Sequence, residues 1–226
     1  MKYYKIEIES NNKKDNILIG CAKGNKIPNA NYYFYEMREG KILLDAPLFD
    51  YFFLESFEKE KYWEKYLLDV HDFLGEGSQI MGWFVSEDLK LLLETFNLSQ
   101  PYHFYPSKLL YKGKKKDYYI FQFTGKSISY TIEEQINFLR SEFWDKEQQQ
   151  NFVVRSPKDF TTEYMRIFDK KIVLQKLVIK QFYDFFPMAT FLHDNLVSER
   201  LKQAIEQMGI TGFEFSELDY EVVVDT

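Results

Sequence analysis

Cysteine is nearly absent from this chain of 226 residues, since Cys21 is the only one. No disulfide can form within the chain, and one thiol cannot build a metal site of several cysteines. Such usage is typical of a reducing compartment. No run approaches the roughly 18 uncharged apolar residues of a membrane span. Residues 2–7 carry charges where a secretory signal needs an apolar segment. The sequence therefore predicts a cytosolic protein without a membrane span.

Histidine is scarce as well, with three residues in the chain. Two of them form His-Asp dipeptides, at 71–72 and 193–194, which hint at a metal-dependent phosphohydrolase. That chemistry needs further His and Asp side chains converging on one ion, and only His103 remains. We therefore interpret the histidines as structural. The alternative is a metal-dependent hydrolase whose site is formed by Asp69, His71 and Asp72.

Motifs of nucleophilic catalysis and of nucleotide binding are also missing. The chain has no Gly-x-Ser-x-Gly turn of the kind that presents a catalytic serine. Residues 20–24 resemble a phosphate loop but lack its Gly-Lys-Ser/Thr ending. Cys21 lies in a strand-like region without an identifiable base, which is typical of a buried, inert thiol. The sequence predicts no catalytic residue, no metal and no cofactor, and it favours a binding protein.

Positive charge is absent from the end of the sequence. The whole net charge of −6 lies after Lys202, where acids occur without any Lys or Arg: Glu206, Glu214, Glu217, Asp219, Glu221 and Asp225. This asymmetry indicates either a basic partner or an ordinary solvated edge. The only dense basic run, Lys112–Lys116, lies between two strand-like segments and predicts a hairpin turn. An acidic chain without a basic stripe argues against direct nucleic-acid binding.

An internal repeat is the most informative feature that is present. The segment Val85–Lys90 (Val-Ser-Glu-Asp-Leu-Lys) recurs as Val197–Lys202 (Val-Ser-Glu-Arg-Leu-Lys), 112 residues later. Each segment begins a stretch with apolar residues at i, i+3, i+4 and i+7, which predicts a helix with one apolar face. Shared helix signals explain part of the likeness, but the combination indicates duplication.

The repeat also predicts how both helices begin and end. Ser86 and Ser198 precede the apolar stripes and are natural N-caps, because a serine hydroxyl can accept an otherwise unpaired helix amide. Asn97 and Gly209 follow the stripes at the position that favours a left-handed backbone conformation. We therefore expect these four residues to be structural helix caps.

The chain alternates between strand-like and helix-like patterns. Each predicted helix leads into an aromatic segment, at 102–105 and at 213–215, and aromatic runs at 32–35 and 51–53 also suggest strands. The sequence predicts an α+β fold: two related strand–helix–strand units, mostly antiparallel sheet and a few amphipathic helices. We expect residues 1–226 to form a single globular chain, with units at approximately 1–125 and 126–226.

The acidic end segment, residues 212–225, alternates acids with apolar residues. A strand with this pattern buries its apolar side chains and turns its acids outward. An outward row of acids steers basic partners and sets the rate and specificity of association. We therefore predict partner-binding residues in this segment: Glu214, Glu217, Asp219 and Glu221.

Two stretches of this region resemble a known family. Val197–Lys202, followed by Met208–Phe215 (Met-Gly-Ile-Thr-Gly-Phe-Glu-Phe), is similar to the C-terminal stretch of a bacterial family assigned as immunity proteins of polymorphic toxin systems. The resemblance covers roughly residues 182–218, with an echo at 83–106. It implies no catalytic residues. The residues of the Val-Ser-Glu-x-Leu-Lys motif would be structural signatures of the family.

The function implied by the resemblance is neutralisation of a toxin delivered by a neighbouring cell. Such a protein binds the toxin's catalytic domain in the cytosol and blocks its active site, and an acid-rich surface suits this role when the toxin is basic. Two alternatives remain at this stage: the metal-dependent hydrolase, and a structural module that self-associates through its aromatic strands.

Overall fold

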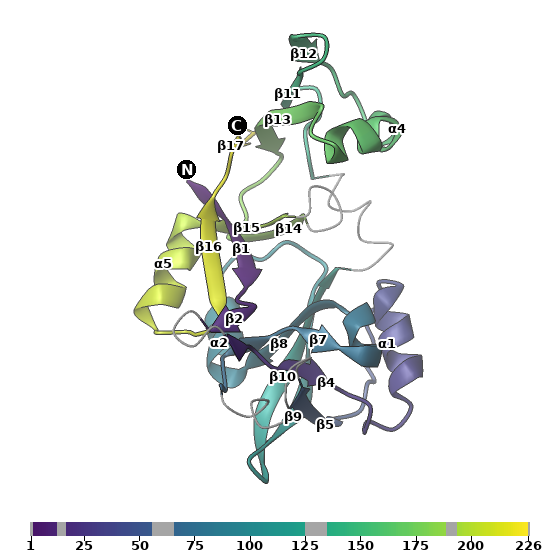
Figure 1. Cartoon of the computed structure of the whole chain (residues 1–226), viewed down its shortest axis with the longest axis vertical. Coiled ribbons are helices and arrows are strands. Elements are labelled where there is room, and N and C mark those ends of the chain that lie inside the picture. Colours follow the sequence, from purple (N-terminus) through teal and green to yellow (C-terminus); the bar gives the residue numbers. More distant parts are fainter. Residues whose placement is uncertain (1, 13–16, 56–65, 125–134, 189–193, 226) are drawn as a thin grey trace.

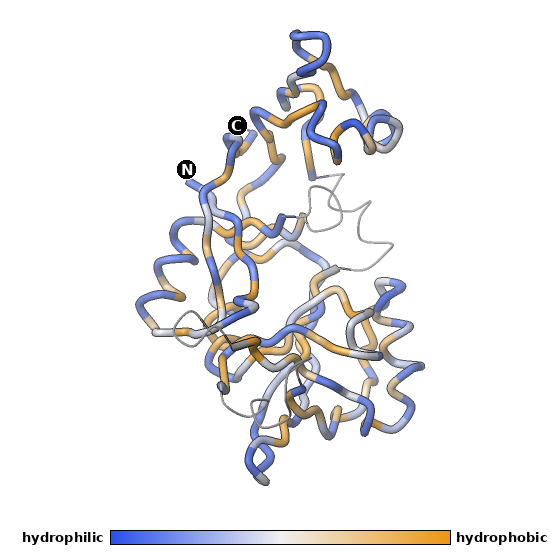
Figure 2. The backbone as a smooth tube through the Cα atoms, viewed as in Figure 1, coloured by the Kyte–Doolittle hydropathy of each residue, from blue (hydrophilic) through white to orange (hydrophobic). Residues whose placement is uncertain are grey.

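A computed structural model describes residues 2–12, 17–55, 66–124, 135–188 and 194–225 (Figure 1). Its fold is α+β with mostly antiparallel sheets, as the sequence predicts. Three sheets follow one another along the long axis of the molecule (Figure 1). Hydrophobic segments are concentrated in the strands, and hydrophilic ones at the turns and hairpin tips (Figure 2).

The largest sheet has the strand order β6-β8-β10-β9-β5-β4-β7. Its strands are β4 (Cys21–Lys23), β5 (Phe49–Glu55), β6 (Val70–His71), β7 (Phe73–Leu74), β8 (Met81–Ser86), β9 (His103–Tyr111) and β10 (Lys114–Thr124). Its two end strands, β6 and β7, are separated in the chain by Asp72 alone. The sheet therefore closes on itself like a small barrel.

Helix α1 (Ala30–Arg38) and the short 3-10 helix η2 (Gly75–Gln79) pack against each other beside this sheet. The aromatic run at 32–35 lies in α1, so the expectation of a strand there was wrong. The reason is the spacing of Ala30, Phe34 and Met37, which lie on one helical face and are buried against the sheet. The second aromatic run, 51–53, does form a strand, in β5.

The second sheet repeats part of the first. It has the order β14-β15-β1-β16, from β1 (Tyr3–Ile8), β14 (Phe185–Met188), β15 (Asp194–Ser198) and β16 (Phe213–Glu217). Helix α2 (Glu87–Leu93) follows β8, and helix α5 (Glu199–Gln207) follows β15. The order β6-β8-β10-β9 thus has a counterpart in β14-β15-β1-β16, and β1 stands where β10 stands in the first sheet.

This correspondence assigns strands to units differently from a simple division of the chain. Strand β1 lies in the range 1–125 but pairs with β15 and β16, which lie in the range 126–226. The contact is long-range and antiparallel, with Tyr4 opposite Val197 on one side and Glu217 on the other. Each unit is a β-α-β segment completed by a further strand: β10, which directly follows β9, in the first unit, and the distant β1 in the second.

The third sheet lies at the far end of the molecule with helix α4 (Pro157–Phe168) (Figure 1). Its order is β12-β11-β13-β17, from β11 (Glu142–Asp145), β12 (Gln150–Phe152), β13 (Ile172–Ile179) and β17 (Glu221–Val224). A two-residue pairing joins β2 (Asn11–Asn12) to β3 (Ile17–Leu18). Strand β17 is parallel to β13, so the end of the chain ties the third sheet to the second.

One hydrophobic core is shared by the two units. Leu89 and Leu93 of α2 are buried together with Leu201 and Ile205 of α5, and the Trp83 ring packs on strand residues from both sheets. Each buried leucine or isoleucine contributes about 1.5–3 kcal/mol relative to an exposed side chain. The units therefore depend on each other for their apolar faces.

Candidate partner-binding surface

The acidic end segment folds as two strands, not as the one strand that its alternation predicts. β16 pairs antiparallel with β1, and β17 pairs parallel with β13 in a different sheet. The chain bends at residues 218–220 between them. Because of this bend, Phe213 and Phe215 pack beside the core shared by the two units, whereas Leu218 and Tyr220 pack against the core formed between the second and third sheets.

All four acids predicted to bind a partner are exposed in this segment. Glu214 lies on β16 opposite Glu7 of β1, and Glu217 ends the same strand. Asp219 lies in the bend and Glu221 begins β17. Glu217 and Glu221 thus lie at the junction of two sheets with Asp219 between them in the sequence, and Glu214 lies further along the strand.

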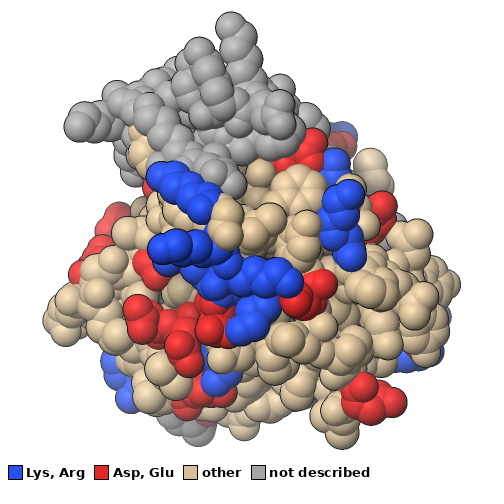
Figure 3. All heavy atoms as spheres, turned by 90° about the horizontal axis from the view of Figure 1, so that it is seen from below, with Lys and Arg blue, Asp and Glu red and all other residues tan. Residues whose placement is uncertain are grey.

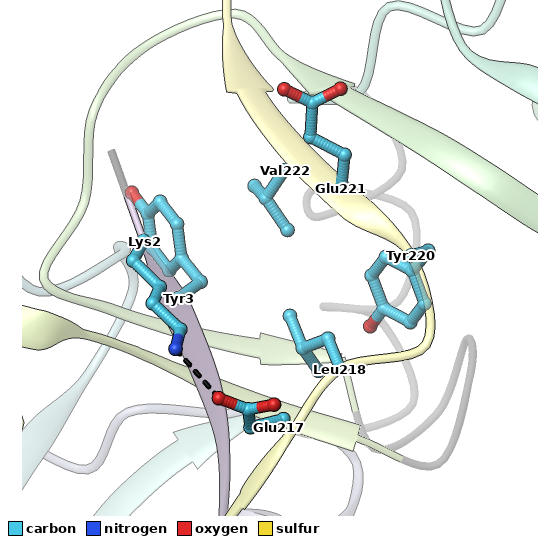
Figure 4. A pocket seen from close by; sticks show the side chains of 7 residues that line it. All are labelled: Lys2, Tyr3, Glu217, Leu218, Tyr220, Glu221 and Val222. Carbon is cyan, nitrogen blue, oxygen red and sulfur yellow. Dashed lines mark hydrogen bonds and ion pairs between the residues drawn. The ribbon is translucent and has the colours of Figure 1, made fainter.

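A hollow of about 410 Å³ opens at this junction. Figure 4 shows the seven side chains that line it: Lys2, Tyr3, Glu217, Leu218, Tyr220, Glu221 and Val222. Leu218 and Val222 point toward each other across the hollow (Figure 4). The hollow therefore has apolar walls and carboxylates at its rim.

Two tyrosines that line the hollow have fixed hydroxyl groups. The Tyr3 hydroxyl donates to the carbonyl of Tyr183 at 2.7 Å, and the Tyr220 hydroxyl donates to Asp194 Oδ2 at 3.2 Å. Burial raises the pKa of both phenols well above its usual value, and the nearby Asp194 carboxylate adds to the effect at Tyr220. Both rings stay neutral at physiological pH and serve as walls.

One lysine of the chain already occupies the acidic rim. Lys2 Nζ lies 2.7 Å from Glu217 Oε1, and the ammonium also lies over the Tyr4 ring. The hydrogen bond from Lys2 lowers the pKa of Glu217, and the same bond raises the pKa of Lys2. Both side chains are largely exposed, so this ion pair is weak and exchangeable.

The cap serines lie at a different place, between the two units. Ser86 Oγ accepts from the Leu89 amide at 3.2 Å, and Ser198 Oγ accepts from the Leu201 amide at the same distance. Both are therefore N-caps. Each hydroxyl also donates to an aspartate: Ser86 to Asp69 at 2.8 Å, and Ser198 to Asp184 at 2.7 Å.

The same two aspartates bind the far end of the opposite helix. Asp69 Oδ2 accepts from the amide and hydroxyl of Thr211, just beyond α5, at 2.8 and 2.7 Å. Asp184 Oδ2 accepts from the Asn97 amide, beyond α2, at 3.0 Å. The N-terminus of each helix thus lies beside the end of the other. We call this arrangement the reciprocal clasp, formed by Asp69, Ser86, Thr211, Asp184, Ser198 and Asn97.

The two helix ends differ from each other. Gly209 adopts the expected left-handed conformation with φ 67°, and the Ile210 amide returns to the Ile205 carbonyl. Asn97 does not take this role, because α2 already ends at Leu93. Asn97 instead donates its side-chain amide to the carbonyl of Phe182 at 2.6 Å and belongs to the clasp.

The residues of the alternative metal site are committed to other bonds. His71 is fully buried; its Nδ1 lies 2.8 Å from the Gly20 carbonyl and its Nε2 accepts from the Leu68 amide. Burial lowers the pKa of His71 to about 4. Asp69 belongs to the clasp, and Asp72 accepts from the Phe73 amide. No cluster of three metal-ligating side chains occurs in the described ranges, and His193 lies outside them.

Cys21 and Asp72 line a second, smaller hollow of about 180 Å³ together with Ile8 and Glu55. Burial raises the pKa of the Cys21 thiol to about 11, with a smaller contribution from the Asp72 carboxylate. Burial also raises the pKa of Asp72. A thiol with such a pKa is protonated at neutral pH. The sequence predicts a buried thiol, whereas Cys21 is only partly buried.

Lys90 and Lys202, the last residues of the repeated motif, contact aromatic rings on neighbouring strands, which the sequence did not reveal. Lys90 bonds to Glu94 one turn later and lies over the Tyr119 and Phe104 rings. In the second unit Lys202 likewise bonds to Glu206 and lies over the Tyr4 and Phe215 rings. The i,i+4 charge pairs are visible in the sequence, but the rings come from distant strands.

The basic run forms the β9–β10 hairpin, with Lys112 and Gly113 at positive φ in its turn. Lys108 pairs with Asp117, and Lys115 pairs with Asp50 at 2.7 Å. Figure 3 shows Lys and Arg mixed with Asp and Glu on this end of the molecule, far from β17. The hairpin therefore presents a partly neutralised surface, not a continuous basic one.

Comparison with known proteins found no matching family model and no matching curated protein. Among the described residues, no helix has the length and apolar composition needed to cross a membrane.

Proposed function

We propose that this chain is an immunity protein that binds a cognate toxin domain in the cytosol and occludes its active site. The proposal combines the family resemblance of residues 182–218 with one structural observation. Glu217 and Glu221 line a hollow with apolar walls at the end of β16, and Asp219 is exposed between them in the sequence. A carboxylate rim around an apolar depression suits a basic protein surface, because the charges steer the encounter and the apolar walls supply contact area.

A second observation supports binding over hydrolysis. Both ring nitrogens of His71 are engaged by the backbone, and Asp69 holds Ser86 and Thr211. A hydrolase using Asp69 would have to break bonds that hold the two units together. The ion pair of Glu217 with Lys2, by contrast, is exposed.

Co-expression with the toxin encoded next to this gene tests the proposal. We expect protection of the host cell and a one-to-one complex in size-exclusion chromatography with light scattering. Neither protection nor a complex would refute the proposed function. Self-association of the chain alone would favour the structural module, and turnover of a substrate that depends on His71 or Asp72 would favour the hydrolase.

A further inference from the structure

A third strand joins β9 in the first unit. The cap serine Ser86 lies opposite Tyr118 on β10, and Tyr118 lies opposite Ser107 on β9. At Ser107 the strand β5 begins to pair with β9 in parallel orientation, with Phe49 as the opposite residue. The Ser107 hydroxyl donates to the Phe49 carbonyl at 2.8 Å, and Phe49 is fully buried. The place beside Ser107 is therefore filled by an extended, apolar segment.

The equivalent place in the second unit is the open edge of β16, next to the hollow. The cap serine Ser198 lies opposite Tyr3 on β1, and β16 stays paired with β1 up to Glu217, opposite Tyr4. The next residue, Leu218, therefore corresponds to Ser107. In the described part of the chain β16 is the last strand of its sheet, so the edge where β5 would follow is open. The hollow adjoins the end of this strand on the side of β1, because Lys2 and Tyr3 line it together with Leu218.

The backbone of β16 can accept another strand. The Glu9 amide donates to the Gly212 carbonyl, so the main-chain groups of Gly212 face β1. Because main-chain groups alternate in direction along a strand, those of Phe213, Phe215 and Glu217 face the open edge. In the first unit the position of Glu217 is held by Pro106, which has no amide to donate.

The side chains around this edge specify the chemistry of an occupant. Glu217 and Glu221 line the hollow and Asp219 lies between them in the sequence, while Leu218 and Val222 form its apolar walls. Lys2 shows how a cation is held there, by its bond to Glu217. A second copy of this chain would bring the same acids against one another and be repelled, whereas a cationic segment is attracted.

We infer that the hollow and the open edge of β16 receive an extended segment of the partner, which carries an apolar residue next to a lysine or arginine. The inference rests on the proposed function and specifies its interface. The segment runs along the open edge of β16 as far as Leu218, where its apolar side chain enters the hollow and its cation displaces Lys2 from Glu217. Addition of a strand to an open sheet edge is a general mode of peptide recognition.

The test uses the full chain and the toxin domain encoded beside its gene, with affinity measured by calorimetry. We expect the double variant Glu217→Gln/Glu221→Gln to bind about tenfold more weakly, with a shallower dependence on salt. We expect Lys2→Met to bind more tightly, because it removes the internal competitor. The matched control is Glu206→Gln, an exposed glutamate that bonds Lys202 on α5 at 2.6 Å, and its affinity should stay within about twofold.

Hydrogen exchange of the complex locates the added strand directly. We expect the amides of Phe215 and Glu217 to gain protection on binding in the full-length protein. A complex whose affinity is unchanged in the double glutamate variant, or whose β16 amides gain no protection, would overturn this inference and leave the proposed function standing. Absence of any complex would overturn both.

Discussion

Asp184 and Ser198 are joined twice, through main chain and side chain. The Ser198 amide donates to the Asp184 carbonyl at 2.8 Å, and the Ser198 hydroxyl donates to its carboxylate at 2.7 Å. Asp69 and Ser86 repeat both bonds at 2.8 Å. Because each aspartate also holds the end of the opposite helix, the clasp couples the orientation of one unit to that of the other.

Replacing Asp184 tests how much the clasp contributes to stability. Burial alone would raise the pKa of Asp184, but hydrogen bonds from Arg200, Ser198 and the Asn97 amide outweigh it and lower the pKa. We expect Asp184→Ala to lower the free energy of unfolding by about 2–3 kcal/mol, because buried donors lose a charged acceptor. Urea unfolding monitored by tryptophan fluorescence measures this loss.

Asp69→Ala is the matched comparison for that variant. Asp88 stands in the first unit where Arg200 stands in the second, so Asp69 has no counterpart of the arginine bond to Asp184. We expect a smaller loss for Asp69→Ala, and almost none for the exposed Asp219→Asn. An equal loss in both clasp variants would show that Arg200 contributes nothing.

Two glycines at positive φ allow the cost of backbone strain to be measured with and without a steric clash. Gly212 has φ 100°, and a Cβ there would lie 2.9 Å from Val70 Cγ1 and from the Val70 carbonyl oxygen. Gly209 has φ 67° and open space around it. We expect Gly209→Ala to cost about 1–2 kcal/mol of stability from strain alone. Gly212→Ala should cost more in the same denaturation assay, and the reverse order would contradict the close approach of residue 212 to β6.

The lowered pKa of His71 leads us to expect a specific pH dependence of stability. Its pKa is about 4 in the folded chain and about 6.5 in the unfolded chain, so the unfolded state binds the extra proton between these values. The contribution of His71 is complete above about pH 6.5 and is lost as the pH falls toward 4. The expected slope approaches 1.4 kcal/mol per pH unit at about pH 5.

Denaturation curves at pH 7, 6 and 5 measure this slope, and His71→Gln should flatten it. His103→Gln is the comparison, because His103 is only half-buried and burial lowers its pKa as well. We expect a smaller change in that variant. An unchanged slope in His71→Gln would rule out titration of the buried imidazole as its source.

We expect the Cys21 thiol to react slowly with thiol reagents. With its pKa raised to about 11, only a small fraction of the thiol is ionised at pH 8, and its partial burial restricts access further. We expect alkylation of the folded chain to be many times slower than that of the urea-unfolded chain, as followed by mass spectrometry. Equal rates would show that the smaller hollow is open to reagents.

Local signals of the sequence predict the local structure well. Ser86 and Ser198 cap helices and Gly209 ends one, because each of these effects depends on a few consecutive residues. The same reasoning does not identify the clasp aspartates. Asp69 precedes its serine by 17 residues and Asp184 by 14, so a fixed repeat offset does not align them.

Pairing between distant strands is the part that the sequence does not reveal. The alternation of residues 212–225 correctly predicts exposed acids, but it cannot show that the chain changes sheets at residues 218–220. The hollow arises from that change. Its residues come from both ends of the sequence, Lys2 and Tyr3 on one side and residues 217–222 on the other, so no local motif marks it.

The position of β1 between β15 and β16 has a consequence for synthesis of the chain. A ribosome makes β1 long before β15 and β16, so β1 lacks both of its neighbours while nearly two hundred residues emerge. The barrel of the first unit, whose strands all lie before residue 125, can close long before. We therefore expect nascent chains to carry a folded barrel and an unpaired β1, which stays available to chaperones until β15 and β16 have emerged.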